Sequence, residues 1–281
     1  MALNRYTSAH FAGALARAWK SIAIKGTELG GTVRLATPLV LTQLAWISMM
    51  TTDIAFIGRL GAKPLAGASL SLMAFFLAYV VCVGVTTATA VLAAQYFGAR
   101  QPRMICRVVC QGLWVSLILT VPCVVAFSGT QWLLTQLGQP PSALPHAASY
   151  MSTLKWGLPF AIAFTVLRNF VSALNRPAMA LLVMFAGVPV NALLDYALIF
   201  GNFGFPRLEL VGAGIATSMI SALMFFALLA IVTWRRPFSR YGILKRFWRP
   251  DWVQFFHIFK IGLPIAGMSF LEASFFIGAV F

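Results

Sequence analysis

Apolar stretches of about 20 residues recur along this 281-residue chain, and they restrict its fold more than any other feature. A helix needs about 20 apolar residues to cross the ~30 Å of hydrocarbon in a bilayer. Only 10% of the residues are charged, against roughly 25% in a soluble domain. The sequence therefore predicts an all-α integral membrane protein, a polytopic helical bundle.

Six complete spans are predicted, followed by a seventh that runs from Ile261 to Phe281. The complete spans are Leu35–Ile57, Leu65–Leu92, Val108–Gly129, Ala148–Leu174, Ala178–Gly201 and Val211–Trp234. Residues 35–234 would thus form one six-helix lobe, and residues 261–281 would begin a second lobe.

The formal net charge of +15 does not indicate nucleic-acid binding, because the basic residues gather in alternate loops. Sixteen of the 21 Lys and Arg residues lie before the first span or after the second, fourth and sixth spans. Such a bias marks the cytoplasmic side of a membrane protein. We therefore expect the N-terminus in the cytoplasm, with every odd-numbered span running outward.

Two basic segments are expected to lie along an anionic membrane surface. Residues 1–34 carry Phe11, Leu15, Trp19 and Ile22 at helical spacing, which predicts an interfacial amphipathic helix. An organelle transit peptide is the alternative for this segment. Residues 235–260 are basic and aromatic, and they predict a second amphipathic helix that links the two lobes.

A short internal repeat supports the division into lobes. "RLATPLVL" opens the first span and "KIGLPIAG" opens the seventh, so Arg34 and Lys260 each stand four positions before a proline. Both spans start on the same side of the membrane. Two units in the same orientation would form a parallel repeat.

Three of the six acidic residues, Asp53, Asp195 and Glu272, fall within predicted spans. A charge at the centre of a membrane helix costs on the order of 3 kcal/mol on the insertion scale. One leucine returns only about 0.5 kcal/mol on that scale. Such residues usually face the bundle interior and mark ion or substrate paths.

The helical rise places two of these carboxylates at a similar depth. Asp53 lies ~27 Å along the first span and Asp195 ~26 Å along the fifth, at 1.5 Å per residue. Thr217 reaches a similar level from the opposite direction. Asn191 lies one turn from Asp195 on the same face, and Pro189 weakens the backbone ladder just before it.

These four side chains, Asp53, Asn191, Asp195 and Thr217, are therefore predicted to share a polar pocket. Two neighbouring carboxylates in low dielectric either share a proton or bind a cation, so the expected ligand is H⁺ or Na⁺. Two structural alternatives remain at this stage. Asp53 could reach the outer interface, and Asp195 could be a hydrogen-bonding residue between helices.

Other residues point to neither an enzyme nor a cofactor. No metal-ligand spacing joins the cysteines to a histidine, and no phosphate-binding or nucleophile motif is present. The four cysteines are interpreted as small packing residues. Several other side chains are expected to line a cavity for apolar molecules, although ordinary packing is the alternative for each of them. They are Gln43, Met49, Met50, Phe75, Phe76 and Tyr196.

Six ordered motifs resemble those of the multidrug and toxic compound extrusion family. They are "TPLVLTQLAWISMMTTDIAFIGRLGAKPLAGASL", "AQYFGAR", "LRNFVSALNRP", "PVNALLDYALIFG", "LVGAGIATS" and "IGLPIAGMSFLE". The resemblance implies a drug:cation antiporter with two six-helix lobes. It also implies a cation site at Asp53, Asn191 and Asp195, with Thr217 beside it and Glu272 in the second lobe.

The resemblance leads to a functional hypothesis with several rivals. We expect export of amphipathic, cationic organic compounds across a bacterial plasma membrane, coupled to H⁺ or Na⁺. The family has about twelve helices, so the missing lobe is an expected partner, and a non-functional fragment is one alternative. The others are a lipid-linked oligosaccharide flippase, which the acidic intramembrane residues disfavour, and a seven-helix receptor.

Overall fold

The chain is described by a computed structural model that covers residues 36–136, 138–139, 141, 143–236, 238–243, 248 and 251–278. Within these ranges every regular element is a helix. The long helices are the first helix Ala36–Gly58, α2 Ala62–Gly98, α3 Pro102–Ser128, α6 Gly157–Ala173, α7 Ala178–Phe200, α8 Glu209–Trp234 and α9 Trp252–Gly278. Three shorter elements are α4 Thr130–Gln136, α5 Leu144–Leu154 and the 3₁₀ helix η1 Phe238–Tyr241.

Six of these helices are long and apolar enough to cross a membrane, and a seventh span exists if α5 and α6 are counted together. This confirms the predicted all-α membrane bundle. The predicted amphipathic segment 1–34 lies outside the described residues.

α2 and α3 are longer than hydropathy predicted, because these helices continue past their apolar centres. α2 has 37 residues, or ~56 Å at 1.5 Å per residue, which exceeds the ~30 Å hydrocarbon core. The predicted span Leu65–Leu92 covers only its middle. α3 likewise begins at Pro102 rather than at Val108.

The predicted fourth span is bent instead of straight. α5 and α6 meet at an angle of 48° across Lys155 and Trp156. Pro159 lies in the first turn of α6. It has no N–H to donate to the carbonyl of Lys155, and its ring displaces that carbonyl. The bend therefore has a local cause in the sequence.

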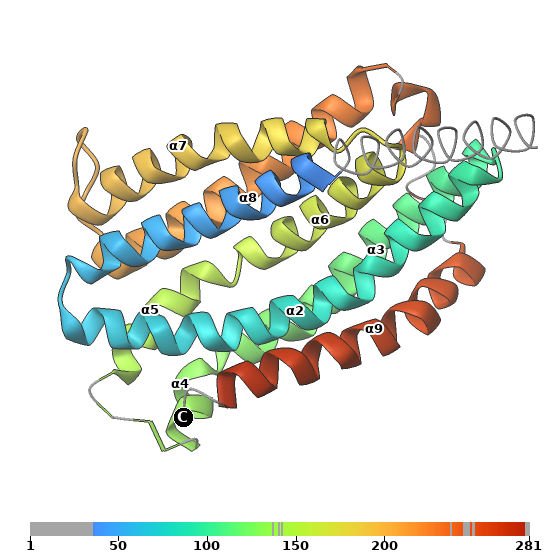
Figure 1. The fold of residues 1–281 in the computed structure, drawn as a ribbon. Helices are drawn as coiled ribbons and strands as arrows, with labels where there is room; N and C mark the ends of the chain where they lie inside the picture. The colour runs from blue at the N-terminus through green and yellow to red at the C-terminus, as the bar shows by residue number, and fades with distance from the viewer. Residues whose placement is uncertain are drawn as a thin grey trace, which may run out of the picture.

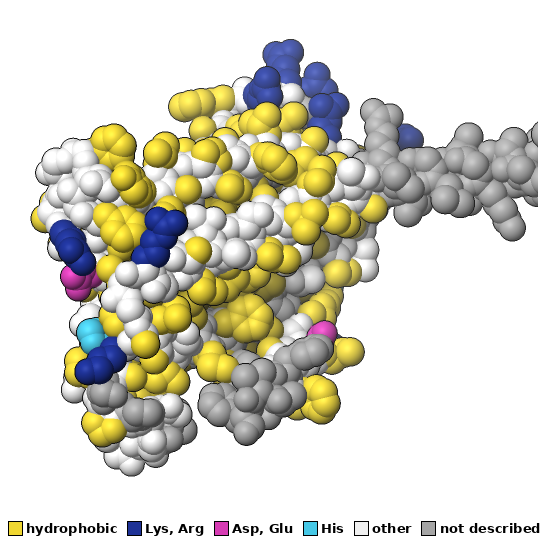
Figure 2. All heavy atoms as spheres, turned by 60° about the vertical axis from the view of Figure 1, so that its left-hand side comes forward, with side chains coloured by type: hydrophobic (Ala, Val, Ile, Leu, Met, Phe, Trp, Pro, Cys, Tyr) yellow, Lys and Arg dark blue, Asp and Glu magenta, His cyan; other side chains and the backbone are white. Residues whose placement is uncertain are grey.

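The helices form a bundle in which α8 and α2 are the two central elements. α8 packs against α5, α6 and α7, whereas α2 packs against α3, α5, α6 and α9. The first helix runs alongside α7 and α8, and α9 lies at the far side of α2 (Figure 1). Hydrophobic side chains cover much of one face of this bundle, and Lys and Arg lie toward its ends (Figure 2).

The segment 235–260 is predicted from the sequence to be one amphipathic helix, and the structure differs from that prediction. Its beginning contains η1, and there Phe238 packs in the core against Phe170. Its last part belongs to α9, which starts at Trp252 rather than at the predicted Ile261. Ile258 is buried against α2 and α3. Apolar burial between helices therefore outweighs the surface placement that the pattern of basic residues had suggested.

Glycines allow α2 and α9 to lie very close together. A Cβ atom on Gly84 would stand 2.5 Å from the Cα atom of Ala266, and one on Gly262 would collide with the carbonyl of Val85. Small residues of this kind let membrane helices approach through their backbones. α9 is thus held on α2 by backbone contact.

Candidate functional site

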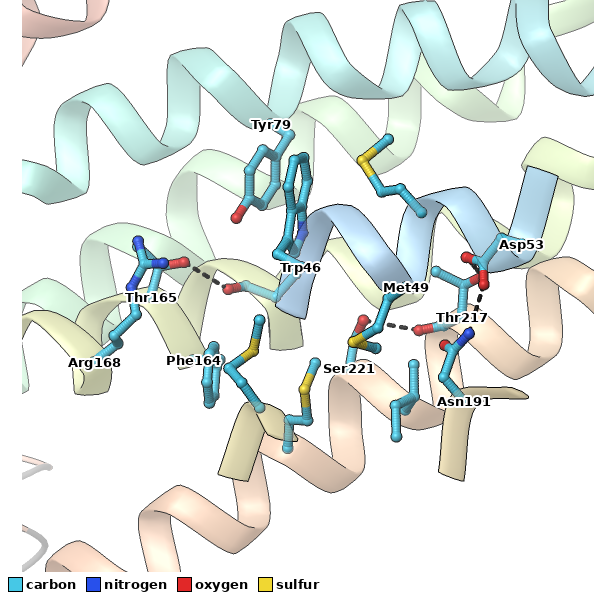
Figure 3. A pocket seen from close by; sticks show the side chains of 15 residues that line it. Trp46, Met49, Asp53, Tyr79, Phe164, Thr165, Arg168, Asn191, Thr217 and Ser221 are labelled. Atoms are coloured by element: carbon cyan, nitrogen blue, oxygen red, sulfur yellow. Dashed lines mark hydrogen bonds between the residues drawn. The ribbon is translucent and has the colours of Figure 1, made fainter. Parts of the chain in front are cut away.

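The structure brings Asp53, Asn191 and Asp195 together in the interior of the bundle, and Figure 3 shows Asp53 and Asn191 side by side. The side-chain amide of Asn191 donates to Asp53 Oδ1 over 2.5 Å and to Asp195 Oδ2 over 2.9 Å. One NH₂ group therefore bridges two carboxyl groups. Asp53 is 8% exposed and Asp195 is fully buried. The alternative in which Asp53 reaches the outer interface is wrong.

Thr217 joins the cluster from α8. Its hydroxyl oxygen lies 3.3 Å from Asp53 Oδ2 and 3.0 Å from the carbonyl oxygen of Ala213. A hydroxyl has one proton, so Thr217 either donates to Asp53 or back-bonds to its own helix. When it back-bonds, its lone pairs are directed at the site. The first helix, α7 and α8 thus each contribute an oxygen-bearing side chain.

Local sequence explains why these side chains meet. Asn191 and Asp195 are one helical turn apart on α7 and share a face. Pro189 cannot donate to the carbonyl of Phe185, which loosens the ladder just before the site. On α8, Gly214 lies against the α5 backbone at Tyr150. This close approach sets Thr217 level with Asp53.

Sequence reasoning missed Tyr150. This residue is fully buried on α5, and its hydroxyl makes no hydrogen bond within the described structure. The side chain lies near the two carboxyl groups and Thr217. Its segment carries no motif or unusual charge, so only its position in the fold distinguishes Tyr150 from an ordinary core aromatic residue.

The cluster is rich in oxygen atoms that lack partners. Asn191 Oδ1 and Asp195 Oδ1 are both buried and accept no hydrogen bond from the described residues. The carboxyl groups of Asp53 and Asp195 are neighbours, because both accept from the same amide nitrogen. The described ion pairs, Arg107 with Asp251 and Arg207 with Glu209, lie elsewhere.

Buried carboxyl groups without a basic partner cannot both be ionised at low cost. A shared proton would satisfy one oxygen from each residue. A hard cation would instead draw on the oxygens of both carboxylates and of Asn191. The geometry therefore suits either occupant.

A cavity of about 80 Å³ extends from this cluster along the first helix (Figure 3). Met49, Met184 and Met224 line its walls, and Arg168 lies at the end opposite Asp53. A cavity of this size holds an ion and a few waters, whereas drug-sized ligands occupy about 300–1,000 Å³. The conformation observed is thus closed to a drug-sized ligand at this position.

A second cavity of about 90 Å³ adjoins the first and shares several of its walls. The predicted residues Met50, Phe75 and Phe76 line it. Trp46 stacks on Tyr79, with ring centroids 6.0 Å apart, and both rings line the two cavities. A shift of this aromatic pair would alter the boundary between the cavities.

Gln43 and Tyr196, predicted for the substrate cavity, and Glu272, predicted for the second lobe, all lie away from the cluster. Gln43 is exposed and lines neither cavity. Tyr196 is 42% exposed and packs on Phe200 and Phe203 at the end of α7. Glu272 is exposed on α9, which packs on α2 and α3 rather than on α7 or α8. Helical position alone could not tell that these side chains point away.

Comparison with known proteins gives the same family as the motifs. The probable multidrug resistance protein NorM of Bradyrhizobium diazoefficiens is 42% identical over 252 residues, which are 90% of this chain and 54% of that protein. A protein of the same name from Rhodopseudomonas palustris is 42% identical over 93% of this chain and 55% of its own length. The chain therefore spans about half the length of these curated relatives.

A solved structure shows the same fold. The eukaryotic MATE transporter AtDTX14 superposes with a TM-score of 0.78 at 18% identity, over 88% of this chain and 54% of that one. The sequence model of the MatE family matches residues 38–197, which is more than half of the chain. This chain therefore belongs to the MatE family, the multidrug and toxic compound extrusion family whose motifs it carries.

Proposed function

We propose that this chain forms the first lobe of a cation-coupled antiporter that exports amphipathic organic compounds. The observation that carries the proposal is the pair of buried carboxyl groups, Asp53 and Asp195, bridged by the amide of Asn191. No described basic residue pairs with either group. A site of this kind needs a proton or a metal cation to be stable inside a membrane.

Coupling would follow from competition for this site. A proton or Na⁺ at the two carboxyl groups would favour the closed arrangement with its cavity of about 80 Å³. An organic cation would favour an arrangement in which the cavity is wider and the carboxylates are free. A ligand shifts such an equilibrium only by its difference in affinity for the two states.

The second lobe would be needed for transport itself. Alternating access requires two units that move against each other, and this chain spans about half the length of its relatives. The chain by itself is therefore proposed to bind cations and substrate. Net transport would require the rest of the protein or a second chain that supplies it.

We place the protein in the bacterial inner membrane with its N-terminus in the cytoplasm. Basic residues follow the C-terminal ends of α2, α6 and α8, where the positive-inside rule expects them. They would also meet anionic lipid headgroups there. The NorM relatives are bacterial proteins, which agrees with this placement.

Proton release from the purified chain tests the proposal. Ethidium, a cationic dye, is added in weakly buffered detergent, with and without Na⁺, to the wild type and to Asp195→Asn. We expect release with the wild type and at least tenfold less with Asp195→Asn. The control Glu209→Gln removes an exposed carboxylate that pairs with Arg207, and it should release protons like the wild type.

The outcomes also separate the two coupling ions. Release on adding Na⁺ alone would show that Na⁺ displaces protons from the site. Release with the dye only would indicate proton coupling. Equal release from wild type and Asp195→Asn would refute the proposed site.

A further inference from the structure

A pair of cysteines joins α2 to α3 at the side of the bundle away from α7. The sulfur atoms of Cys82 and Cys123 lie 4.0 Å apart. Cys82 is 1% exposed, and Cys123 is partly buried. Met151, Leu158 and other apolar side chains pack around the pair. The acidic cluster is built from other residues, so this pair is a separate feature of the lobe.

The pair borders a large apolar cavity. This cavity has a volume of about 500 Å³ and lies between α2, α3, α4 and α9. Cys123 lines it directly, together with Met73, Leu77, Phe127 and Phe270. Its volume falls within the range of pockets that bind small organic molecules, about 300–1,000 Å³. One thiol of the pair, that of Cys123, therefore borders a space large enough for an organic group, and Cys82 lies directly behind it.

The surroundings exclude a structural zinc site within the described residues. Zinc takes four ligands in such sites, and no group of three or more His, Cys, Asp and Glu side chains gathers in the described structure. The dithiol offers two soft sulfur ligands. A suitable ligand must need bonds to only two sulfurs, and its complex must carry no net charge in the membrane interior.

We propose that Cys82 and Cys123 bind a trivalent organoarsenical whose organic group lies in the apolar cavity. Arsenic(III) with one organic substituent needs two sulfurs and forms a neutral product. Trivalent arsenic is pyramidal, so two bonds, each about as long as the ~2.3 Å of a zinc–thiolate bond, hold their sulfurs about 3.5 Å apart. The observed separation of 4.0 Å must therefore close by about 0.5 Å, which a small rotation of the Cys123 side chain supplies.

The reaction is balanced without an oxidant. The Cys123 thiol adds first, because it is the one that lines the cavity, and its proton passes to the arsenic-bound oxygen. The Cys82 thiol then forms the second As–S bond. The oxygen leaves as water with both thiol protons, so one arsenical and two thiols give one dithioarsenite and one water.

The second pair of cysteines provides a matched comparison. Cys106 and Cys110 lie one turn apart on α3. Their thiols are directed at backbone carbonyls, Cys110 at Ile243 over 3.0 Å and Cys106 at Gly242 over 3.8 Å. This pair does not line the apolar cavity. Replacing both with alanine leaves Cys82 and Cys123 as the chain's remaining thiols.

Phenylarsine oxide is the probe for the test, applied to the Cys106→Ala/Cys110→Ala chain in detergent. We expect one adduct per chain by intact mass, with both thiols consumed and resistance to washing with excess monothiol. Cys82→Ala or Cys123→Ala in that background should weaken retention at least a hundredfold, because the chelate is lost. Retention that either replacement leaves unchanged would overturn the proposal.

A cavity variant tests where the organic group lies. Leu77→Trp narrows the apolar cavity and leaves both cysteines in place. It should weaken retention of phenylarsine oxide about tenfold, or by 1.4 kcal/mol, and leave that of a methylarsenical unchanged. Equal retention of both probes in wild type and Leu77→Trp would show that the cavity plays no part. Circular dichroism and gel filtration confirm that each variant is folded.

Discussion

Asn191 on α7 donates a hydrogen bond of 2.5 Å to Asp53 on the first helix. The same amide group donates to Asp195 one turn along α7. Asn191 therefore holds two acidic side chains at one point and ties two helices that are far apart in the sequence. Any movement of the first helix away from α7 must break this bridge. The contact between the two carboxyl groups and the packing of the first helix on α7 therefore both depend on the side chain of Asn191.

Removing the bridge should destabilise the lobe. In Asn191→Ala, two buried carboxyl groups lose their shared donor, and we expect the free energy of unfolding to fall by about 2 kcal/mol. Asn202→Ala, in the loop after α7, should change it by less than about 0.5 kcal/mol. Thermal unfolding in detergent measures both. In Asn191→Ala/Asp53→Ala the two effects should not add, because each replacement removes the same hydrogen bond; full additivity would contradict this.

The hydroxyl of Tyr150 should contribute nothing to stability. It is buried and makes no hydrogen bond within the described structure, so Tyr150→Phe removes an unsatisfied polar group. The midpoint of thermal unfolding should stay unchanged or rise. Tyr150→Ala should lower the unfolding free energy by about 3–5 kcal/mol, because it leaves a cavity. A clear loss of stability in Tyr150→Phe would show that the hydroxyl has a partner.

A side chain at Gly84 should separate α9 from α2. A Cβ atom there would lie 2.5 Å from Ala266 Cα, so Gly84→Val forces the helices apart. We expect faster proteolysis of the segment before α9 and a lower unfolding midpoint. Gly98→Ala is the control, because nothing lies within 4 Å of a Cβ atom at that position. Similar proteolysis of both variants would mean that the contact does not hold α9.

The charge of Arg168 should oppose the binding of cations in the cavity. Arg168 lines the cavity that also contains Asp53, and like charges repel more strongly in a low dielectric. Arg168→Gln should therefore tighten ethidium binding by up to about tenfold, or 1.4 kcal/mol. Arg176→Gln, on the exposed turn after α6, should leave the affinity unchanged. Fluorescence titration measures the affinities, and weaker binding in Arg168→Gln would show that Arg168 attracts the dye.

The sequence by itself determined the membrane class, the number of spans and the identity of the acidic cluster. Apolar runs of about 20 residues permit little other than membrane helices. A costly carboxylate within such a run needs a partner. Counting the helical rise then placed Asp53 and Asp195 at one depth, because a helix converts sequence distance directly into length.

Tertiary structure alone decided which side chains point inward and which helices touch. Tyr150 is buried near the site and Tyr196 is exposed away from it, although both are aromatic residues on predicted spans. The rotation of each helix depends on contacts between residues far apart in the sequence, such as Gly84 with Ala266 and Cys82 with Cys123. These contacts follow from packing the whole bundle, because no local pattern along one helix specifies the face that its neighbour will cover.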